Sequence, residues 1–369
     1  MIEIKKVPQT TTVATRRMIR RLFRFESGFI SVLYRIMSWI RKLAIDLGTS
    51  NCTIWGGSEE ILLNEPSVVA IEAESKKVLA AGNEAKKMEG KTPDYIEIIK
   101  PIEFGAVVDY EAAVGMLKWF LREVMGSAWL LGPEVMVTVA SGLTQVEQRA
   151  VLDAVLEAGA RKVYLIDTPL AAAIGAKIPI SEPFGNMVVN IGGGIIEAAV
   201  VASGGVVASK CYRGGGSRLD ESLQEYLKKK YGLVVGDQTV ELVKIKLGTA
   251  VKLKKMETLL VSGRDLVYGL PKSVELNSDE IFEVIRPMLD EVILLVRETL
   301  QVTAPELVAD IADRGMVLVG GASKIRNMAL LLTREIGVSV HLSTEPEFCV
   351  IKGAGMAMEN LEIYRKSIR

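Results

Sequence analysis

The sequence predicts an α/β protein with two similar halves, in each of which a parallel or mixed sheet is flanked by helices. Two observations carry this prediction. Apolar runs of strand length alternate with helical segments along the chain, which favours strands joined by helical crossovers. In addition, a strand pair turned by glycine occurs twice, at Leu43–Trp55 and Met187–Val201. A repeat of this kind indicates an internal duplication.

The first strand pair, LAIDLGTSNCTIW, combines a glycine turn with small polar side chains. Asp46 ends the first strand, Gly48 turns the backbone, and Thr49, Ser50 and Asn51 follow. Backbone N–H groups in such a turn suit a phosphate, and the Asp46 carboxylate can hold a hydrated divalent ion. A buried hairpin with an ordinary Asp-x-Gly turn is the alternative interpretation.

The second strand pair, MVVNIGGGIIEAAVV, repeats this architecture with Asn190 at the end of its first strand. Its turn consists of three consecutive glycines, Gly192, Gly193 and Gly194. Two such loops that face each other across a cleft would clamp a polyphosphate from both sides. The pair is therefore a more specific signal for phosphate binding than either loop alone.

A third glycine turn and several helices complete the expected halves. Gly320-Gly321 follows an apolar strand and can let a flat base approach the backbone. Helical periodicity covers Glu111–Val124. Two further helices are expected, one capped by Thr144 or Ser141 and running through Ala158, and one capped by Ser278 or Asp279, covering Ile281–Leu300 and interrupted at Pro287.

The N-terminal segment differs in charge from the rest of the chain. Residues 1–42 hold ten Lys and Arg against two Glu, a net charge of +8, so the remainder carries −8 in a chain of zero net charge. This asymmetry argues against a nucleic-acid-binding body. Residues 16–42 show helical periodicity with a cationic face and an apolar face; the apolar face includes Ile19, Leu22, Phe23, Phe29, Leu33, Ile36 and Ile40.

This periodicity predicts a helix that lies in the plane of an anionic membrane surface. Its longest uncharged stretch, Ser27–Tyr34, is far shorter than the roughly 20 residues of a membrane span. No small-residue cleavage site follows, so a signal peptide fits poorly. A helix packed on the body or on a partner protein is the alternative. Trp129, Leu130 and Leu131 lie between glycines, and we interpret them either as a second membrane contact or as a loop folded onto the core.

Composition limits the remaining possibilities. A chain of 369 residues with 49% hydrophobic and 24% charged residues suits two ordered domains. Cys52, Cys211 and Cys349 are far apart, which predicts free thiols in a reducing cytosol. His341 is the only histidine, so a histidine-based triad or multi-histidine metal site is not expected.

With these motifs in place, the chain resembles the MreB-like bacterial actins of the actin-like ATPase superfamily over about residues 43–365. The resemblance is carried by IDLGTSN, LNEPSVVAI, GNEAKKMEGKTP, VLDAVLEAGARKVYLID, GNMVVNIGGG, GRDLVYGLPK, PELVADIADRGMVLVGGASKIRN and CVIKGAGMAME. It implies an actin-like duplicated fold with a nucleotide cleft between two domains. It also implies ATP or ADP with Mg²⁺ as cofactors, and filaments on the cytoplasmic face of the inner membrane. Other cell-shape proteins are the partners expected beside the chain itself.

The same resemblance suggests how the chain is divided. Residues 1–42 would be an extension with the membrane helix. Residues 43–183 would form domain I, with a small subdomain at about 73–102 and with 346–369 returning to it. Residues 184–345 would form domain II, with a small subdomain at about 227–283.

Site residues follow from the resemblance position by position. Asp46 matches the Mg-linked acid, Gly48 and Thr49–Asn51 match the first phosphate loop, and Asn190 with Gly192–Gly194 matches the second. The stretch that borders the nucleoside corresponds to Val240, Glu241, Leu242, Val243 and Lys244. The adenine-side turn corresponds to Gly320, Gly321, Ala322 and Ser323.

Several family positions are changed in this chain. The acid pair before proline reads Asp167-Thr168, the acid of the second phosphate loop is Asn190, and the two threonines after its glycines are Ile195 and Ile196. Thr168 can hydrogen-bond a water molecule but is a poor base. We therefore expect nucleotide binding with slow or absent hydrolysis, in which Asp167 could partly substitute. A non-catalytic scaffold that co-assembles with another filament protein and, with less support, a phosphotransferase of the same fold are the alternatives.

Overall fold

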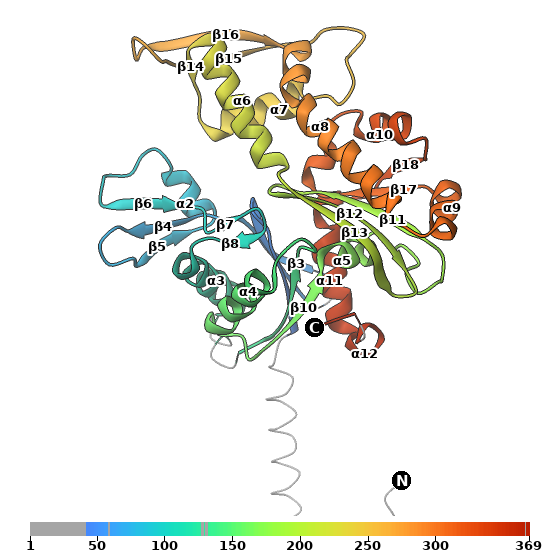
Figure 1. Cartoon of the computed structure of the whole chain (residues 1–369). Helices are drawn as coiled ribbons and strands as arrows, with labels where there is room; N and C mark the ends of the chain where they lie inside the picture. Colours follow the sequence, from blue (N-terminus) through green and yellow to red (C-terminus); the bar gives the residue numbers. More distant parts are fainter. Residues whose placement is uncertain (1–41, 58–59, 127–128, 130–131, 366) are drawn as a thin grey trace, which may run out of the picture. The chain divides into compact units, whose positions relative to one another are not determined.

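Two five-stranded sheets with equivalent strand order form the framework of the described chain (Figure 1). The first sheet has the order β10-β9-β1-β2-β3 and the second has β13-β12-β11-β17-β18. In each, a central antiparallel hairpin adds a third antiparallel strand on one side and two parallel strands on the other. The duplication predicted from the glycine hairpins is thus confirmed as two mixed sheets of the same topology.

The computed structural model describes residues 42–57, 60–126, 129, 132–365 and 367–369. The expected amphipathic helix of residues 16–42 lies outside these residues apart from Lys42, and so do Leu130 and Leu131. Within the described ranges, no helix combines the length and the apolar character needed to cross a membrane.

The strands of the two sheets correspond in pairs. In the first sheet they are β1 (Lys42–Leu47), β2 (Asn51–Gly56), β3 (Glu60–Pro66), β9 (Glu134–Val139) and β10 (Lys162–Asp167). In the second they are β11 (Asn186–Ile191), β12 (Ile195–Ala202), β13 (Gly205–Arg213), β17 (Met316–Val319) and β18 (Val340–Leu342). The central strands β1, β11 and β12 are largely buried, as expected for apolar runs covered on both faces.

Helices cover the outer faces of both sheets. The helices α3 (Tyr110–Met125) and α4 (Gln145–Glu157) pack on the first sheet, and α6 (Gly216–Tyr231), α8 (Ser278–Gln301), α9 (Pro305–Arg314) and α10 (Met328–Ile336) belong to the second half. Of the two caps that the sequence suggested for α4, Thr144 and Ser141, the structure shows Thr144, which forms a capping box with Glu147.

The predicted start of α8 and its predicted interruption are both wrong. The cap is Asn277, one residue earlier than expected, because its side chain accepts a hydrogen bond from the Glu280 N–H while Glu280 reaches back. Pro287 lies inside the continuous helix. The carbonyl four residues before it belongs to the exposed Glu283, where water can replace the lost partner.

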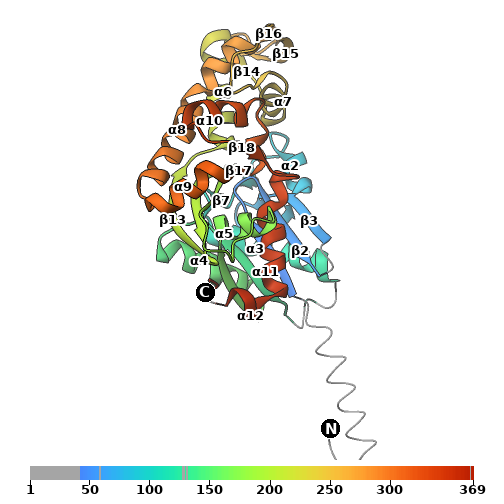
Figure 2. The same cartoon turned by 90° about the vertical axis from the view of Figure 1, so that its right-hand side faces the viewer.

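Two helices lie between the sheets. Both views place α11 (Cys349–Glu359) beside α5 (Thr168–Gly175) (Figures 1 and 2). Their shared core includes side chains from both sheets. The helices meet at backbone distance, since a Cβ at Gly353 would collide with the Ala171 carbonyl oxygen and one at Gly175 with that of Cys349.

Smaller elements extend each half. Beside the first sheet lie β4 (Val69–Glu72), β5 (Val78–Ala81), β6 (Ile96–Ile99), α2 (Asn83–Met88), β7 (Ile102–Glu103) and β8 (Ala106–Val107). Beside the second lie β14 (Leu233–Val234), β15 (Thr258–Asp265), β16 (Pro271–Asn277) and α7 (Asp237–Leu247). The remaining short elements are η2 (Gly321–Lys324), η3 (Pro346–Phe348) and α12 (Leu361–Tyr364).

Candidate nucleotide site

A cavity of about 560 Å³ opens where the turns of the two central hairpins meet. Both predicted phosphate loops line it. From the first half come Asp46, Gly48, Thr49, Ser50 and Asn51, and from the second come Asn190, Gly192, Gly193 and Gly194. The duplicated topology thus brings two loops far apart in sequence to one site, as the sequence predicted.

The two loops touch each other. A Cβ at Gly193 would collide with Ser50 Oγ, and a Cβ at Gly194 would collide with Thr49 Oγ1. Ser50 Oγ also lies 3.4 Å from Ser217 Oγ, in the first turn of α6. Glycine is therefore required in the second loop because any side chain there would push the loops apart.

Asp46 lies at the base of the first loop. Its carboxylate accepts a 2.6 Å hydrogen bond from Thr138 Oγ1. Burial raises the pKa of Asp46, and the Thr138 hydrogen bond opposes this rise in part. A half-buried carboxylate with one protein donor beside a phosphate loop offers the oxygen ligand that Mg²⁺ prefers.

Glu197 is a cavity residue that the sequence reasoning missed. It is 1% exposed and lies opposite Asn190 in the β11–β12 register. Its Oε1 accepts hydrogen bonds from Ser141 N at 2.7 Å and Ser141 Oγ at 3.0 Å, while Oε2 lies 3.5 Å from Asn190 Nδ2. Since Ser141 follows β9, these bonds join the two sheet-bearing halves.

The environment of Glu197 favours its neutral form. Burial raises the pKa of Glu197 to about 7, although the hydrogen bonds from Ser141 and Asn190 act in the opposite direction. A sequence signal was available, because Glu197 is the only charged residue in the apolar run Met187–Val201. A charge placed in a buried strand needs a partner or a function.

The two residues that replace the family's acid pair point to different places. Thr168, the first residue of α5, is buried and lines the cavity. Asp167 is not among the lining residues, and its carboxylate pairs with Arg369. Burial raises the pKa of Asp167, and the Arg369 guanidinium counteracts this. Ile195 lines the cavity, where it presents an apolar surface.

Only part of the predicted nucleoside stretch reaches the cavity. Glu241 and Lys244 line it, and Lys244 Nζ donates a 2.8 Å hydrogen bond to Asp220 Oδ2. The other three residues of the stretch do not line it: Val240 and Val243 are buried in the core of the second half, and Leu242 is 46% exposed. A helix that borders a cavity presents only one of its faces to it.

The predicted adenine-side turn is largely at the cavity as well. Gly320, Gly321 and Ala322 line it, whereas Ser323 is buried with its hydroxyl donating to the Gly320 carbonyl. The structure adds lining residues that the sequence did not predict; those near this turn include Lys324, Ile325, Arg326, Glu347, Phe348 and Val350.

Trp129 packs against the protein. Its indole N–H donates a 3.2 Å hydrogen bond to the Ala158 carbonyl, and the Arg122 guanidinium lies 4.4 Å from the ring centroid. The side chain contacts the core of the first half. For Trp129 these contacts favour the interpretation of a loop folded onto the core over that of a membrane contact.

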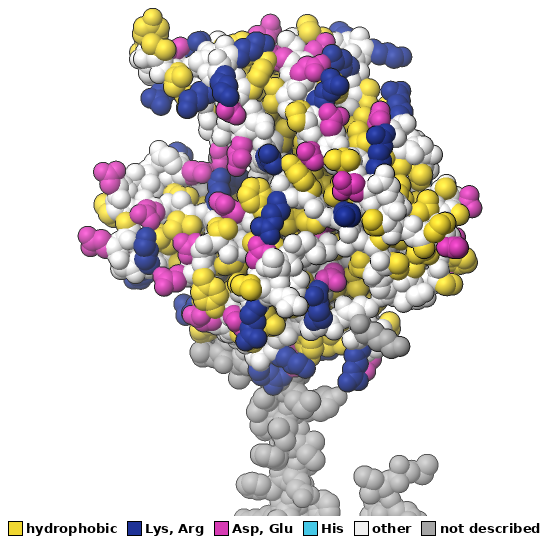
Figure 3. Space-filling view, in the orientation of Figure 1, with side chains coloured by type: hydrophobic (Ala, Val, Ile, Leu, Met, Phe, Trp, Pro, Cys, Tyr) yellow, Lys and Arg dark blue, Asp and Glu magenta, His cyan; other side chains and the backbone are white. Residues whose placement is uncertain are grey.

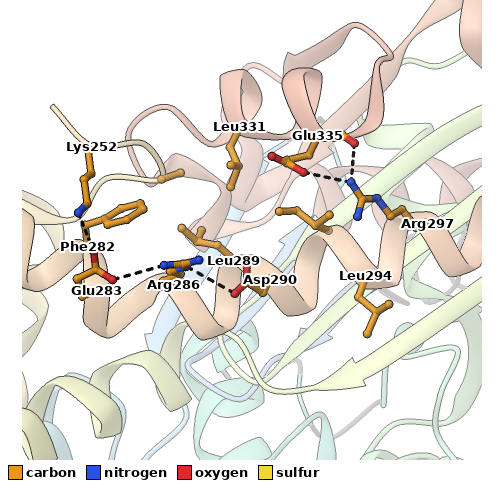
Figure 4. A pocket seen from close by; sticks show the side chains of 12 residues that line it. Lys252, Phe282, Glu283, Arg286, Leu289, Asp290, Leu294, Arg297, Leu331 and Glu335 are labelled. Atoms are coloured by element: carbon orange, nitrogen blue, oxygen red, sulfur yellow. Dashed lines mark hydrogen bonds and ion pairs between the residues drawn. The ribbon is translucent and has the colours of Figure 1, made fainter. Parts of the chain in front are cut away.

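A second cavity, of about 410 Å³, lies between α8, α10 and the segment around Lys252 (Figure 4). Its charged groups are paired with one another. Lys252 lies 2.8 Å from Glu283, and Arg297 lies 3.1 Å from Glu335. The cavity between the hairpins is the better candidate for a ligand-binding site, because its polar groups converge on one open space.

Known proteins share both the sequence and the fold. A family model described as MreB/Mbl protein matches residues 40–366. The cell shape-determining protein MreB of Escherichia coli (strain K12) is 42% identical over 327 residues, which cover 87% of this chain and 94% of that protein. The cell shape-determining protein Mbl of Bacillus subtilis (strain 168) is 38% identical over 322 residues, with 87% and 97% covered.

Solved structures agree with this match. The crystal structure of MreB 5 of Spiroplasma citri bound to AMPPNP has a TM-score of 0.81 at 31% identity, and covers 88% of this chain and 98% of that one. The MamK double helical filament has a TM-score of 0.71 at 19% identity, with 86% and 99% covered. The second likeness concerns the fold alone.

Proposed function

Because the chain belongs to the MreB/Mbl family, we propose that it is a cytoskeletal protein that binds ATP, assembles into filaments and helps to determine cell shape. The resemblance read from the motifs and the actin-like fold that it implied are both confirmed. We take residues 43–183 with 346–369 as one domain and residues 184–345 as the other, with the cavity between them.

One observation carries the nucleotide-binding part of the proposal. Two glycine-turned loops from duplicated halves touch across one cavity, so closely that Gly193 and Gly194 admit no side chain. Backbone N–H groups of such loops bind phosphate oxygens without help from particular side chains. The Spiroplasma citri relative has been solved bound to AMPPNP and to ADP, which supports the same ligand class here.

Asp46 is the residue that would hold Mg²⁺. Among the described residues, no three His, Cys, Asp or Glu side chains gather into a metal site. One carboxylate together with water and substrate phosphates is a common ligand set for Mg²⁺. The ion would supply charge neutralisation around the phosphates.

We propose that hydrolysis is weakened in this chain. Thr168 stands at the cavity with a hydroxyl that can orient a water molecule but cannot take its proton efficiently, and Asp167 pairs with Arg369. Asn190 brings no charge, and Ile195 brings no hydroxyl. The buried Glu197 is held by Ser141, so it positions the two halves relative to each other.

The tip of the β15–β16 hairpin supports self-association. Leu266, Val267, Tyr268 and Leu270 are 46%, 80%, 79% and 64% exposed, and hydrophobic side chains stand out at the upper-left tip of the space-filling view, above a group of Lys and Arg side chains (Figure 3). Adjacent exposed apolar side chains are typical of protein contact sites. Membrane attachment through the apolar face of residues 16–42 stays part of the proposal, on the strength of its sequence periodicity.

The test combines electron microscopy with a phosphate-release assay. The full chain is incubated on anionic liposomes with ATP, with ADP or without nucleotide. We expect filaments with ATP, and a phosphate-release rate that Thr168→Glu raises about 100-fold, since a positioned base contributes roughly 10²–10⁴-fold. The matched control, Thr144→Glu, lies outside the cavity lining and should leave the rate unchanged.

Three results would contradict parts of the proposal. Absence of ATP binding would refute the nucleotide site. Absence of filaments in every condition would favour the non-catalytic scaffold that co-assembles with another filament protein. Rapid phosphate release by the unmodified chain would refute weakened hydrolysis, because Thr168 would then suffice as it stands.

A further inference from the structure

Lys100 reaches from the first half of the chain to the second. It follows β6 in the small lobe formed by β4, β5, α2 and β6, and the helices α6 and α7 of the second half lie above this lobe (Figure 1). Its Nζ donates a 3.0 Å hydrogen bond to Asp237 Oδ2. Glu89 Oε1, at the end of α2, lies 3.8 Å from the same nitrogen. The ammonium group thus bridges a carboxylate of each half.

Asp237 is the first residue of α7, the helix that forms part of the cavity wall. Glu241 and Lys244 line the cavity one and two turns further along this helix. The other Asp237 oxygen accepts a 2.8 Å hydrogen bond from Gln224 Nε2 of α6, which keeps the carboxylate in place. An ion pair at Asp237 therefore acts on a wall of the cavity, although neither Lys100 nor Asp237 lines it.

Three carboxylates act on the Lys100 ammonium group, two of them from the second half. Burial acts to lower the pKa of Lys100, but the hydrogen bond to Asp237 and the charges of Asp237, Glu89 and Glu221 outweigh it and raise the pKa. Lys86 is a further cation whose charge acts on Asp237. Without the Lys100 charge, carboxylates of the two halves would face each other and repel.

From this geometry we propose that Lys100 controls the exchange of bound nucleotide. Its two ion pairs, with Glu89 and Asp237, form a clasp that holds the α7 wall to the first half, and the clasp must open before a nucleotide enters or leaves. This role rests on the proposed nucleotide-binding function and adds to it a control of exchange. Exposed ion pairs are weak, so the clasp sets a rate and does not lock the cavity.

Stopped-flow fluorescence measures both directions of exchange on the full chain. Binding of N-methylanthraniloyl-ATP, a fluorescent analogue of ATP, gives the association rate, and its displacement by excess ATP gives the release rate. Lys100→Met removes the charge and keeps most of the side-chain volume. It should raise the release rate about threefold, the size of one exposed ion pair. The association rate should rise as well, because entry and exit need the same opening.

Salt gives a signature that a merely structural role would not show. Raising the KCl concentration from about 50 mM to about 300 mM screens exposed charges, so it should speed release from the unmodified chain more than from Lys100→Met. In Lys100→Glu repulsion replaces the clasp, and release should be about tenfold faster than from the unmodified chain. Added salt should slow release from Lys100→Glu relative to Lys100→Met. Effects of salt on the phosphates are common to all three proteins and cancel in these comparisons.

A matched control lies in the same small lobe. Lys76 pairs with Glu97 at 3.1 Å and is as exposed as Lys100, at 51%, but both partners belong to the first half. Lys76→Met should therefore leave both rates unchanged. Asp237→Asn should speed release, and the double variant with Lys100→Met should be no faster than Lys100→Met alone, because the two residues act through one contact. A thermal melt of each variant establishes that it is folded.

The outcomes separate the clasp from the proposed function. Equal exchange rates in the unmodified chain, Lys100→Met and Lys100→Glu would overturn the clasp and leave nucleotide binding intact. Faster release from Lys100→Met with the salt dependence of the unmodified chain would also overturn it, since the lysine would then act through packing. Failure of the unmodified chain to bind ATP or its fluorescent analogue would refute the proposed function and the clasp with it.

Discussion

The buried Glu197 makes the stability of this protein depend on pH. In the folded protein the Glu197 pKa is about 7, against an ordinary value of 4.5. Between these pH values the folded state keeps a proton that the unfolded chain has released. The stabilising contribution of this proton is fully present below pH 4.5 and is lost as the pH rises through 7.

The size of the effect follows from the two pKa values. A pKa difference of about 2.5 corresponds to about 3.4 kcal/mol over the full window. Linkage places about 2.5 kcal/mol of this loss between pH 5 and pH 8. Glu197→Gln keeps an oxygen that can accept from Ser141 N and Oγ, but it does not titrate. The unmodified chain should therefore lose about 2.5 kcal/mol relative to Glu197→Gln over this interval.

Urea denaturation followed by tryptophan fluorescence measures this at both pH values. Groups other than Glu197 titrate alike in the two proteins and cancel in the difference between them. A difference that is constant within about 0.5 kcal/mol from pH 5 to pH 8 would refute the reasoning. It would show that Glu197 is ionised in the folded state well below pH 7.

Three further changes have outcomes set by the geometry. Gly353→Ala places a methyl group against the Ala171 carbonyl and should cost about 3 kcal/mol or more in urea denaturation, because backbone cannot yield as a side chain does. Gly193→Ala forces the second loop away from Ser50 and should weaken ATP binding about tenfold (about 1.4 kcal/mol) in calorimetry; unchanged affinity would contradict the clamp. Asn277→Ala removes the cap of α8 and should cost about 1 kcal/mol in the same denaturation assay without changing ATP affinity.

Local patterns predicted the hairpins and their duplication. The pattern around Gly48 and Gly192 is an apolar strand, a polar residue, a glycine turn and a second strand. It depends only on residues adjacent in sequence, so both phosphate loops could be located. Thr144, one of the two caps suggested for α4, could be found for the same reason. The capping box of α8 was also readable, since Asn277 stands three residues before Glu280, but neighbouring Ser278 and Asp279 offered competing caps.

Contacts between distant segments could not be predicted in this way. The ion-pair partner of Asp167 is Arg369, and that of Glu347 is Lys324. In neither pair are the two residues separated by the three or four positions that bring side chains together on a helix. Val240 and Val243 are three residues apart on one helix face, so periodicity alone indicated that they share an environment. It did not tell whether that environment is the core or the cavity.

The pairing of α5 with α11 affects the order in which the chain can fold during synthesis. The two helices meet through Gly175 and Gly353, which are separated by most of the second half of the chain. The inner face of the first sheet, including Ala44 and Trp55, is covered by this pair. The first half therefore emerges from the ribosome with this apolar sheet face covered only by α5 until residues 349–359 of α11 follow. Such long-range closure slows folding and exposes intermediates to aggregation, so we expect nascent chains truncated before Cys349 to require a chaperone.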